Sequence, residues 1–215
     1  MDLLIENKLS EYKTHIIDYA TLKSILVNMD YDNINDKIVN MKQKGIIKSI
    51  KKGFYIHTSL INKNIVAKEL ISNNLLNNPS YISLDYALSF YGLIPEAVHE
   101  VTAITTKRSK VFNTDIGVFS YKHIKNELFR IGVKIEFFKK NAFLIASKEK
   151  AICDKIYFTK GIELTSKSSM IDFLESDLRI DIDEFEYFDT NIIAEYSQVS
   201  KSKKIQILLN LIKEL

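Results

Sequence analysis

The amino-acid sequence predicts an α+β protein in two parts, a small N-terminal one and a larger C-terminal one. Three observations predict this class. Apolar residues recur at helical spacing in three segments of the first 45 residues, and two short β-rich runs joined by Lys-Lys-Gly follow them. Further along, alternating and β-branched runs between about residues 98 and 146 give way to mainly helical patterns.

The N-terminal part orders its elements as three helices followed by a hairpin. We expect helices over residues 2–13, 16–29 and 30–45 and strands over residues 46–50 and 54–57. In the third helix, Ile34, Ile38 and Met41 fall at i, i+4 and i+7, and Gly45 stands where a helix-ending glycine belongs. With a tight turn at Gly53, this is the order of a winged helix-turn-helix, which we predict as a DNA-binding domain over residues 1–58.

The C-terminal part is predicted as a small, mostly antiparallel sheet with flanking helices. A linker or connecting helix is expected over residues 59–79, and the C-terminal domain over residues 80–215. Ser83 is the expected cap of a helix that ends near Tyr91, and Ser147 is the expected cap of the helix 148–158. Strands are expected within residues 98–106, 111–124 and 132–147, and helices after residue 169.

Burial of the apolar face of the third helix leaves its polar face for solvent or for a ligand. Asparagine can pair with adenine through two hydrogen bonds, and lysine reaches guanine or phosphate. The start of a recognition helix reads base edges, so we expect Tyr31, Asn33 and Asn35 to set sequence preference. The hairpin lysines have no acidic residue between positions 41 and 57, and they either meet phosphates or simply solvate an exposed hairpin. The predicted DNA-binding set is Tyr31, Asn33, Asn35, Lys37, Asn40, Lys44, Lys48, Lys51, Lys52 and Tyr55.

Composition and charge narrow the class of protein further. The 215-residue chain has no apolar run near the roughly 20 residues that span a bilayer, so we expect no membrane partner. The single cysteine, Cys153, excludes an internal disulfide and fits a cytoplasmic protein. Residues 104–150 hold eleven basic and four acidic residues, a net +7, whereas residues 161–190 hold two basic and nine acidic residues, a net −7. This segregation either serves charged partners or folds back on itself.

The sequence predicts neither an enzyme nor a cofactor-binding protein. The four histidines stand far apart, and the six glycines form no phosphate-binding loop, so we expect no catalytic residues, no metal site and no cofactor. The enzyme alternative is a divalent-metal nuclease built on Asp115, Glu136 and Lys139 or Lys140. Its weakness is that Glu136 and Lys139 are three residues apart and face opposite sides of a strand.

A charged cluster opens the helix expected over residues 148–158. It consists of Lys148, Glu149, Lys150 and Asp154. Lys150 and Asp154 are four residues apart, so we expect a surface ion pair worth a few tenths of a kcal/mol. Cys153 falls on the apolar side of the same helix, where a buried thiol is expected.

Two stretches, "GLIPE" with a following "TTKR" and the later "ASKEKAICD", resemble the AbiEi antitoxins of bacterial abortive-infection (type IV) toxin–antitoxin systems. In order and spacing the resemblance extends from Asp18 to Leu215, and the Gly-Phe-Tyr hairpin fits the same architecture. The matching positions are Gly92, Leu93, Ile94, Pro95, Glu96, Thr105 or Thr106, Lys107, Arg108, Ala146, Glu149, Lys150, Ala151 and Asp154.

The resemblance implies two activities for the chain. It implies an autorepressor that binds inverted repeats in its own promoter, and an antitoxin that counteracts a nucleotidyltransferase-like toxin, AbiEii, in phage defence. The basic residues after the predicted domain boundary face either DNA or an acidic toxin surface, and a second phosphate-binding patch favours DNA. This second patch is Lys107, Arg108, Lys110 and Lys122. The alternative is a stand-alone winged-helix transcription regulator of a defence locus, without a toxin partner.

Overall fold

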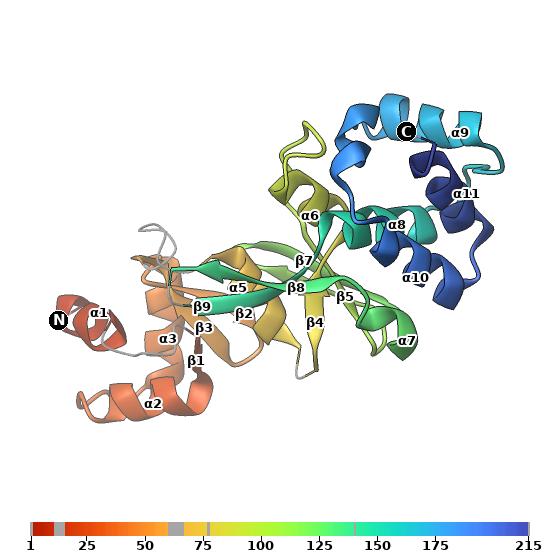
Figure 1. Ribbon diagram of the computed structural model, residues 1–215. Coiled ribbons are helices and arrows are strands. Elements are labelled where there is room, and N and C mark those ends of the chain that lie inside the picture. The colour runs from red at the N-terminus through yellow and green to blue at the C-terminus, as the bar shows by residue number, and fades with distance from the viewer. Residues whose placement is uncertain (1, 11–15, 60–66, 77, 140, 215) are drawn as a thin grey trace.

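The structure is a computed structural model that describes residues 2–10, 16–59, 67–76, 78–139 and 141–214. It is an α+β fold with a three-stranded antiparallel sheet and a six-stranded mixed sheet. Figure 1 shows the N-terminal helices at one end, the large sheet in the middle and the C-terminal helices at the other end. The two chain ends therefore lie far apart.

The N-terminal part contains one element that the sequence pattern did not predict. Its elements are α1 (Asp2–Ser10), β1 (Ile16–Asp18), α2 (Tyr19–Val27), α3 (Ile34–Gln43), β2 (Ile47–Lys51) and β3 (Phe54–His57), with the sheet order β1-β3-β2. The expectation of helix from residue 16 is wrong, because Ile16 and Ile17 pair with β3 as a strand. Asp18 then caps α2 by accepting a hydrogen bond from the Thr21 amide at 2.7 Å.

Both turns expected from glycine are confirmed. Gly45 has φ +67°, and the amides of Gly45 and Ile46 donate to the carbonyls of Lys42 and Met41, which ends α3 in a Schellman motif. Gly53 has φ +75° at the turn between β2 and β3. A left-handed backbone favours glycine at both places, so these two residues set where the helix stops and where the hairpin turns.

The C-terminal part joins its strands in an order that differs from the chain order. Its elements are α5 (Lys68–Leu75), β4 (Ser80–Ile82), α6 (Leu84–Phe90), β5 (Val101–Thr105), β6 (Lys110–Thr114), β7 (Gly117–His123), α7 (Asn126–Phe129), β8 (Val133–Phe138), β9 (Asn141–Ala146), α8 (Lys148–Phe158), α9 (Lys167–Asp172), a π-helical turn (Phe173–Asp177), a 3₁₀ helix (Ile182–Tyr187), α10 (Thr190–Ser200) and α11 (Lys203–Ile212). The sheet order is β6-β7-β5-β4-β9-β8. Two neighbour pairs, β4 with β9 and β5 with β7, are parallel and the other three are antiparallel, so the sheet is mixed.

Helices cover the two faces of the large sheet. The Tyr121 hydroxyl on β7 donates to the Ser72 carbonyl of α5 at 2.6 Å, and burial raises the Tyr121 pKa to about 12. The Tyr81 hydroxyl on β4 instead donates to Asp154 of α8 at 3.0 Å. Tyr121 pairs with Ala103 and Tyr81 with Ile104, and consecutive residues of β5 point to opposite faces. Hence α5 lies on one face of the sheet and α8 on the other.

The two sheets meet edge to edge. Asp115, in the turn after β6, donates its amide to the Ser49 carbonyl of β2 at 3.1 Å, and its carboxylate accepts from the Ser49 amide at 2.9 Å. Lys42 at the end of α3 also forms an ion pair with Asp115 at 3.5 Å. Ile50 and Ile56 pack with the large C-terminal core rather than with the small core of residues 5–47. The N-terminal hairpin is therefore attached directly to the C-terminal sheet.

Within the described residues, no helix is both long enough and apolar enough to cross a membrane.

Candidate functional site

The outward face of α3 carries a mixture of amide, acidic and apolar side chains. Asn33 caps the start of the helix by position, without a side-chain capping bond, and Asn35 and Asn40 are exposed. Val39, one helical turn after Asn35, is 53% exposed. Val39 is not in the predicted DNA-binding set. An exposed apolar side chain at its position, between Asn35 and Asn40, can contact a thymine methyl group. This face therefore presents hydrogen-bond donors and acceptors and one apolar side chain to solvent.

A tyrosine outside the predicted set positions Asn35. The Tyr19 hydroxyl, at the start of α2, donates to Asn35 Oδ1 at 2.9 Å, and the Tyr19 amide donates to the Gly53 carbonyl at 2.7 Å. Tyr19 thus links α3 to the hairpin turn. An amide oxygen has two lone pairs, so Asn35 keeps one of them, with its amide hydrogens, available for a further hydrogen bond. The sequence did not single out Tyr19, because the strand β1, which places this residue beside the turn, was not predicted.

The start of α3 is less suited to phosphate contact than its end. Asp32 and Asp36 are exposed there, and their carboxylates repel a phosphate backbone. Lys37 lies 4.6 Å from the centre of the Tyr31 ring. The Tyr31 hydroxyl is buried and has no hydrogen-bond partner within the described residues. In this structure Tyr31 supports Lys37 and does not present its hydroxyl to solvent.

The predicted hairpin residues separate into two groups. Lys52 is exposed at the turn, and Lys48 and Tyr55 are half-buried on β2 and β3. Lys44 is exposed at the end of α3. Lys51 points elsewhere: its Nζ donates to the Leu75 carbonyl of α5 at 3.1 Å. The prediction grouped Lys51 with the other hairpin lysines, but the structure turns it toward the C-terminal part.

Three of the four residues in the predicted second basic patch gather around Lys51. Lys107, Arg108 and Lys110 line a pocket of about 520 Å³ together with Lys51. Lys122 does not line this pocket, because it lies on the opposite face of β7, with its Nζ 5.4 Å from the Phe158 ring centre of α8. The structure therefore joins the hairpin and most of the second patch into one basic region.

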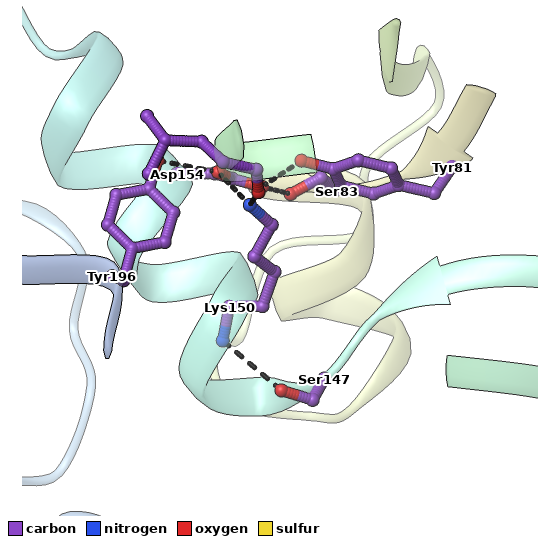
Figure 2. Close-up of polar contacts among 7 residues, drawn as sticks. Tyr81, Ser83, Ser147, Lys150, Asp154 and Tyr196 are labelled. Atoms are coloured by element: carbon purple, nitrogen blue, oxygen red, sulfur yellow. Dashed lines mark hydrogen bonds and ion pairs between the residues drawn. The ribbon is translucent and has the colours of Figure 1, made fainter. Parts of the chain in front are cut away.

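Figure 2 shows a second polar cluster, which lies in the C-terminal part, and its side chains are fully buried. The Lys150 and Asp154 side chains of α8 are each 0% exposed and form an ion pair with 3.2 Å between Lys150 Nζ and Asp154 Oδ1. Asp154 accepts hydrogen bonds from the hydroxyls of Ser83 at 2.7 Å, Tyr196 at 2.8 Å and Tyr81 at 3.0 Å. The expectation of a surface pair at these positions is wrong.

The same cluster explains the local role of Ser83. Ser83 stands at the start of α6 as expected, but its hydroxyl bonds to Asp154 and not to the helix. Ser147 does cap α8, accepting from the Lys150 amide at 3.2 Å. Lys150 Nζ also donates to the Leu128 carbonyl of α7 at 2.7 Å. The cluster therefore ties α8 to β4, α6, α7 and α10.

Burial sets the electrostatics of this cluster. Desolvation lowers the pKa of Lys150, and Asp154 acts in the opposite direction. Burial and the Asp154 charge raise the pKa values of the Tyr81 and Tyr196 hydroxyls, which keeps both as donors. Lys150 also lies 4.5 Å from the Tyr196 ring centre. Neither charged side chain reaches solvent, so the cluster forms polar contacts between elements inside the C-terminal part.

The residues of the nuclease alternative do not come together. Asp115 follows β6 at one edge of the six-stranded sheet and bonds to Ser49, whereas Glu136 is in β8 at the other edge. Lys140 lies outside the described residues. Among the side chains that the structure describes, no group of three histidines, cysteines or acids is arranged to hold a metal ion.

No protein-family model and no curated protein matches the chain.

Proposed function

We propose that the chain is a cytoplasmic DNA-binding antitoxin and autorepressor, with residues 1–58 as a winged helix-turn-helix. In this proposal α3 is the recognition helix and the β2–β3 hairpin is the wing. The DNA is double-stranded and carries the inverted repeats of its own promoter. The toxin is a nucleotidyltransferase-like protein of the AbiEii kind.

One observation carries the DNA-binding part of the proposal: the exposed face of α3 lies beside the hairpin turn. The elements run in the order α1, β1, α2, α3, β2, β3 with β1 paired to β3, which is the order of winged-helix DNA-binding domains. Tyr19 contacts both Asn35 and Gly53, so the helix and the wing form one surface. A helix in the major groove and a wing on the neighbouring backbone fit such a surface.

The charges on this surface assign different roles to its parts. In this proposal the exposed residues Asn33, Asn35, Val39 and Asn40 contact the bases, because amide groups and an apolar side chain can discriminate between base pairs. Phosphate contacts then come from the basic residues at the end of α3 and on the wing, together with Lys37. These phosphate-contacting residues are Lys37, Lys44, Lys48 and Lys52.

Replacing Lys48 and Lys52 together by alanine is expected to weaken binding to all duplexes alike. Each lost phosphate contact reduces the slope of log affinity against log salt by about 0.9, so the double variant loses a slope of about 2. Fluorescence anisotropy with a labelled promoter duplex at several salt concentrations measures this slope. A matched control removes two exposed lysines at the ends of α11, Lys203 in its first turn and Lys213 directly after it, and retains the original slope. A slope unchanged by the wing substitutions contradicts the assignment of the wing.

The antitoxin part of the proposal is supported by the resemblance to AbiEi proteins. Co-expression with the nucleotidyltransferase-like toxin of the same locus tests it, with bacterial growth as the readout. Growth restored by the wild-type chain supports the antitoxin role. If the chain binds the promoter but restores no growth, the antitoxin role is wrong and the chain is a stand-alone transcription regulator.

A further inference from the structure

The pocket at the junction of the two sheets has an unusual lining. It is lined by Lys51 of β2 and by Lys107, Arg108 and Lys110 from the start of β6 and the loop before it. Phe112 and Leu75 supply apolar walls, and no acidic side chain lines it among the described residues. Four cationic groups around a pocket of about 520 Å³ repel one another unless an anion lies between them.

Lys51 is held in place at this pocket. Its Nζ donates to the Leu75 carbonyl at 3.1 Å and lies 4.2 Å from the Phe54 ring centre. Burial, and then the charge of Lys110, lower the pKa of the Lys51 amine. Lys110 in turn lies 4.5 Å from the ring centre of Phe112. Two ammonium groups are thus fixed near one another by contacts with carbonyl and aromatic groups, and neither of these contacts neutralises their charge.

We propose that this junction pocket binds a phosphate group and thereby links the β2–β3 hairpin to the C-terminal sheet. The guanidinium of Arg108 can bind two phosphate oxygens through a pair of parallel hydrogen bonds, and the lysines contribute compact positive charges. The phosphate comes either from a DNA backbone or from a small phosphorylated molecule. The pocket and its charges do not depend on the proposed recognition of a promoter.

Occupation of the pocket has a structural consequence. A phosphate between Lys51 and Lys110 replaces their repulsion by two attractions, one to β2 and one to β6. These strands already meet through the Ser49–Asp115 hydrogen bonds. A bound phosphate therefore stabilises the folded chain, because binding to the folded state alone raises its stability.

Thermal unfolding of the full chain with inorganic phosphate tests the proposal, with sodium chloride at equal ionic strength as the reference. At a phosphate concentration about ten times the dissociation constant, the midpoint rises by roughly 3–5 °C over the chloride reference. Lys110→Gln and, separately, Arg108→Gln are expected to lose most of this rise. Lys122→Gln makes the same charge change one strand away, outside the pocket, and retains the rise.

Two results overturn the proposal: a phosphate effect no larger than that of chloride, or an equal effect in Lys110→Gln and Lys122→Gln. A random-sequence DNA duplex then separates the two phosphate sources. If the source is a DNA backbone, Lys110→Gln binds the duplex more weakly than Lys122→Gln does, and inorganic phosphate competes with the duplex. If the source is a small phosphorylated molecule, the two variants bind the duplex equally and only the thermal shift separates them.

Discussion

Replacing Lys150 by methionine is expected to lower the free energy of unfolding by about 3–5 kcal/mol. The substitution retains most of the side-chain volume but removes the ammonium group. Asp154 is then left as a buried carboxylate without its cation, and the Leu128 carbonyl loses a donor at 2.7 Å. Urea unfolding followed by circular dichroism measures the loss.

A neighbouring lysine provides the control. Lys148, in the first turn of the same helix, pairs with Glu184 at 3.8 Å, and both side chains are well exposed. Lys148→Met is expected to cost at most about 1 kcal/mol, because exposed ion pairs contribute little. Asp154→Asn, which leaves Lys150 buried without an anion, is expected to resemble Lys150→Met. Equal stability of Lys148→Met and Lys150→Met contradicts the role assigned to the buried cluster.

Replacing Asn35 by alanine is expected to remove discrimination at one base pair of the operator. A bidentate contact between asparagine and adenine is worth about 1–3 kcal/mol, which corresponds to a roughly 5- to 150-fold loss of preference at that position. The loss appears in competition binding with duplexes that differ at single base pairs. Affinity for unrelated DNA changes little, because phosphate contacts remain.

Two further variants separate base recognition from general damage. Tyr19→Phe removes only the hydroxyl that donates to Asn35 at 2.9 Å, so it is expected to give a smaller loss at the same base pair. Asn210→Ala makes the same change as Asn35→Ala on the exposed side of α11, and it leaves the preference intact. A base preference that survives Asn35→Ala shows that another element reads the DNA.

The parts of the fold that the sequence predicted correctly are those that the chemistry of single residues determines locally. Gly45 and Gly53 marked the end of α3 and the hairpin turn, because a positive φ favours glycine there. Ser147 marked the start of α8 by its capping bond. The strand β1 was missed because three residues, Ile16 to Asp18, are too few to show an alternating pattern.

Tertiary contacts decided what the sequence did not predict. Lys150 and Asp154 have the spacing of a surface pair, and they are buried because hydroxyls from β4, α6 and α10 converge on them. The parallel pairing of β4 with β9 joins segments about sixty residues apart, and no local pattern encodes it. The direction of the Lys51 side chain likewise depends on contacts with α5 and β6, and neither element is near Lys51 in the sequence.

The most direct test of the proposed function is the affinity of the wild-type chain for its own promoter. Fluorescence anisotropy compares a duplex that carries the promoter inverted repeats with a scrambled duplex of the same composition and length. We predict at least about a thousand-fold tighter binding to the promoter duplex at physiological salt. Equal affinity for the two duplexes contradicts the proposal that α3 reads an operator.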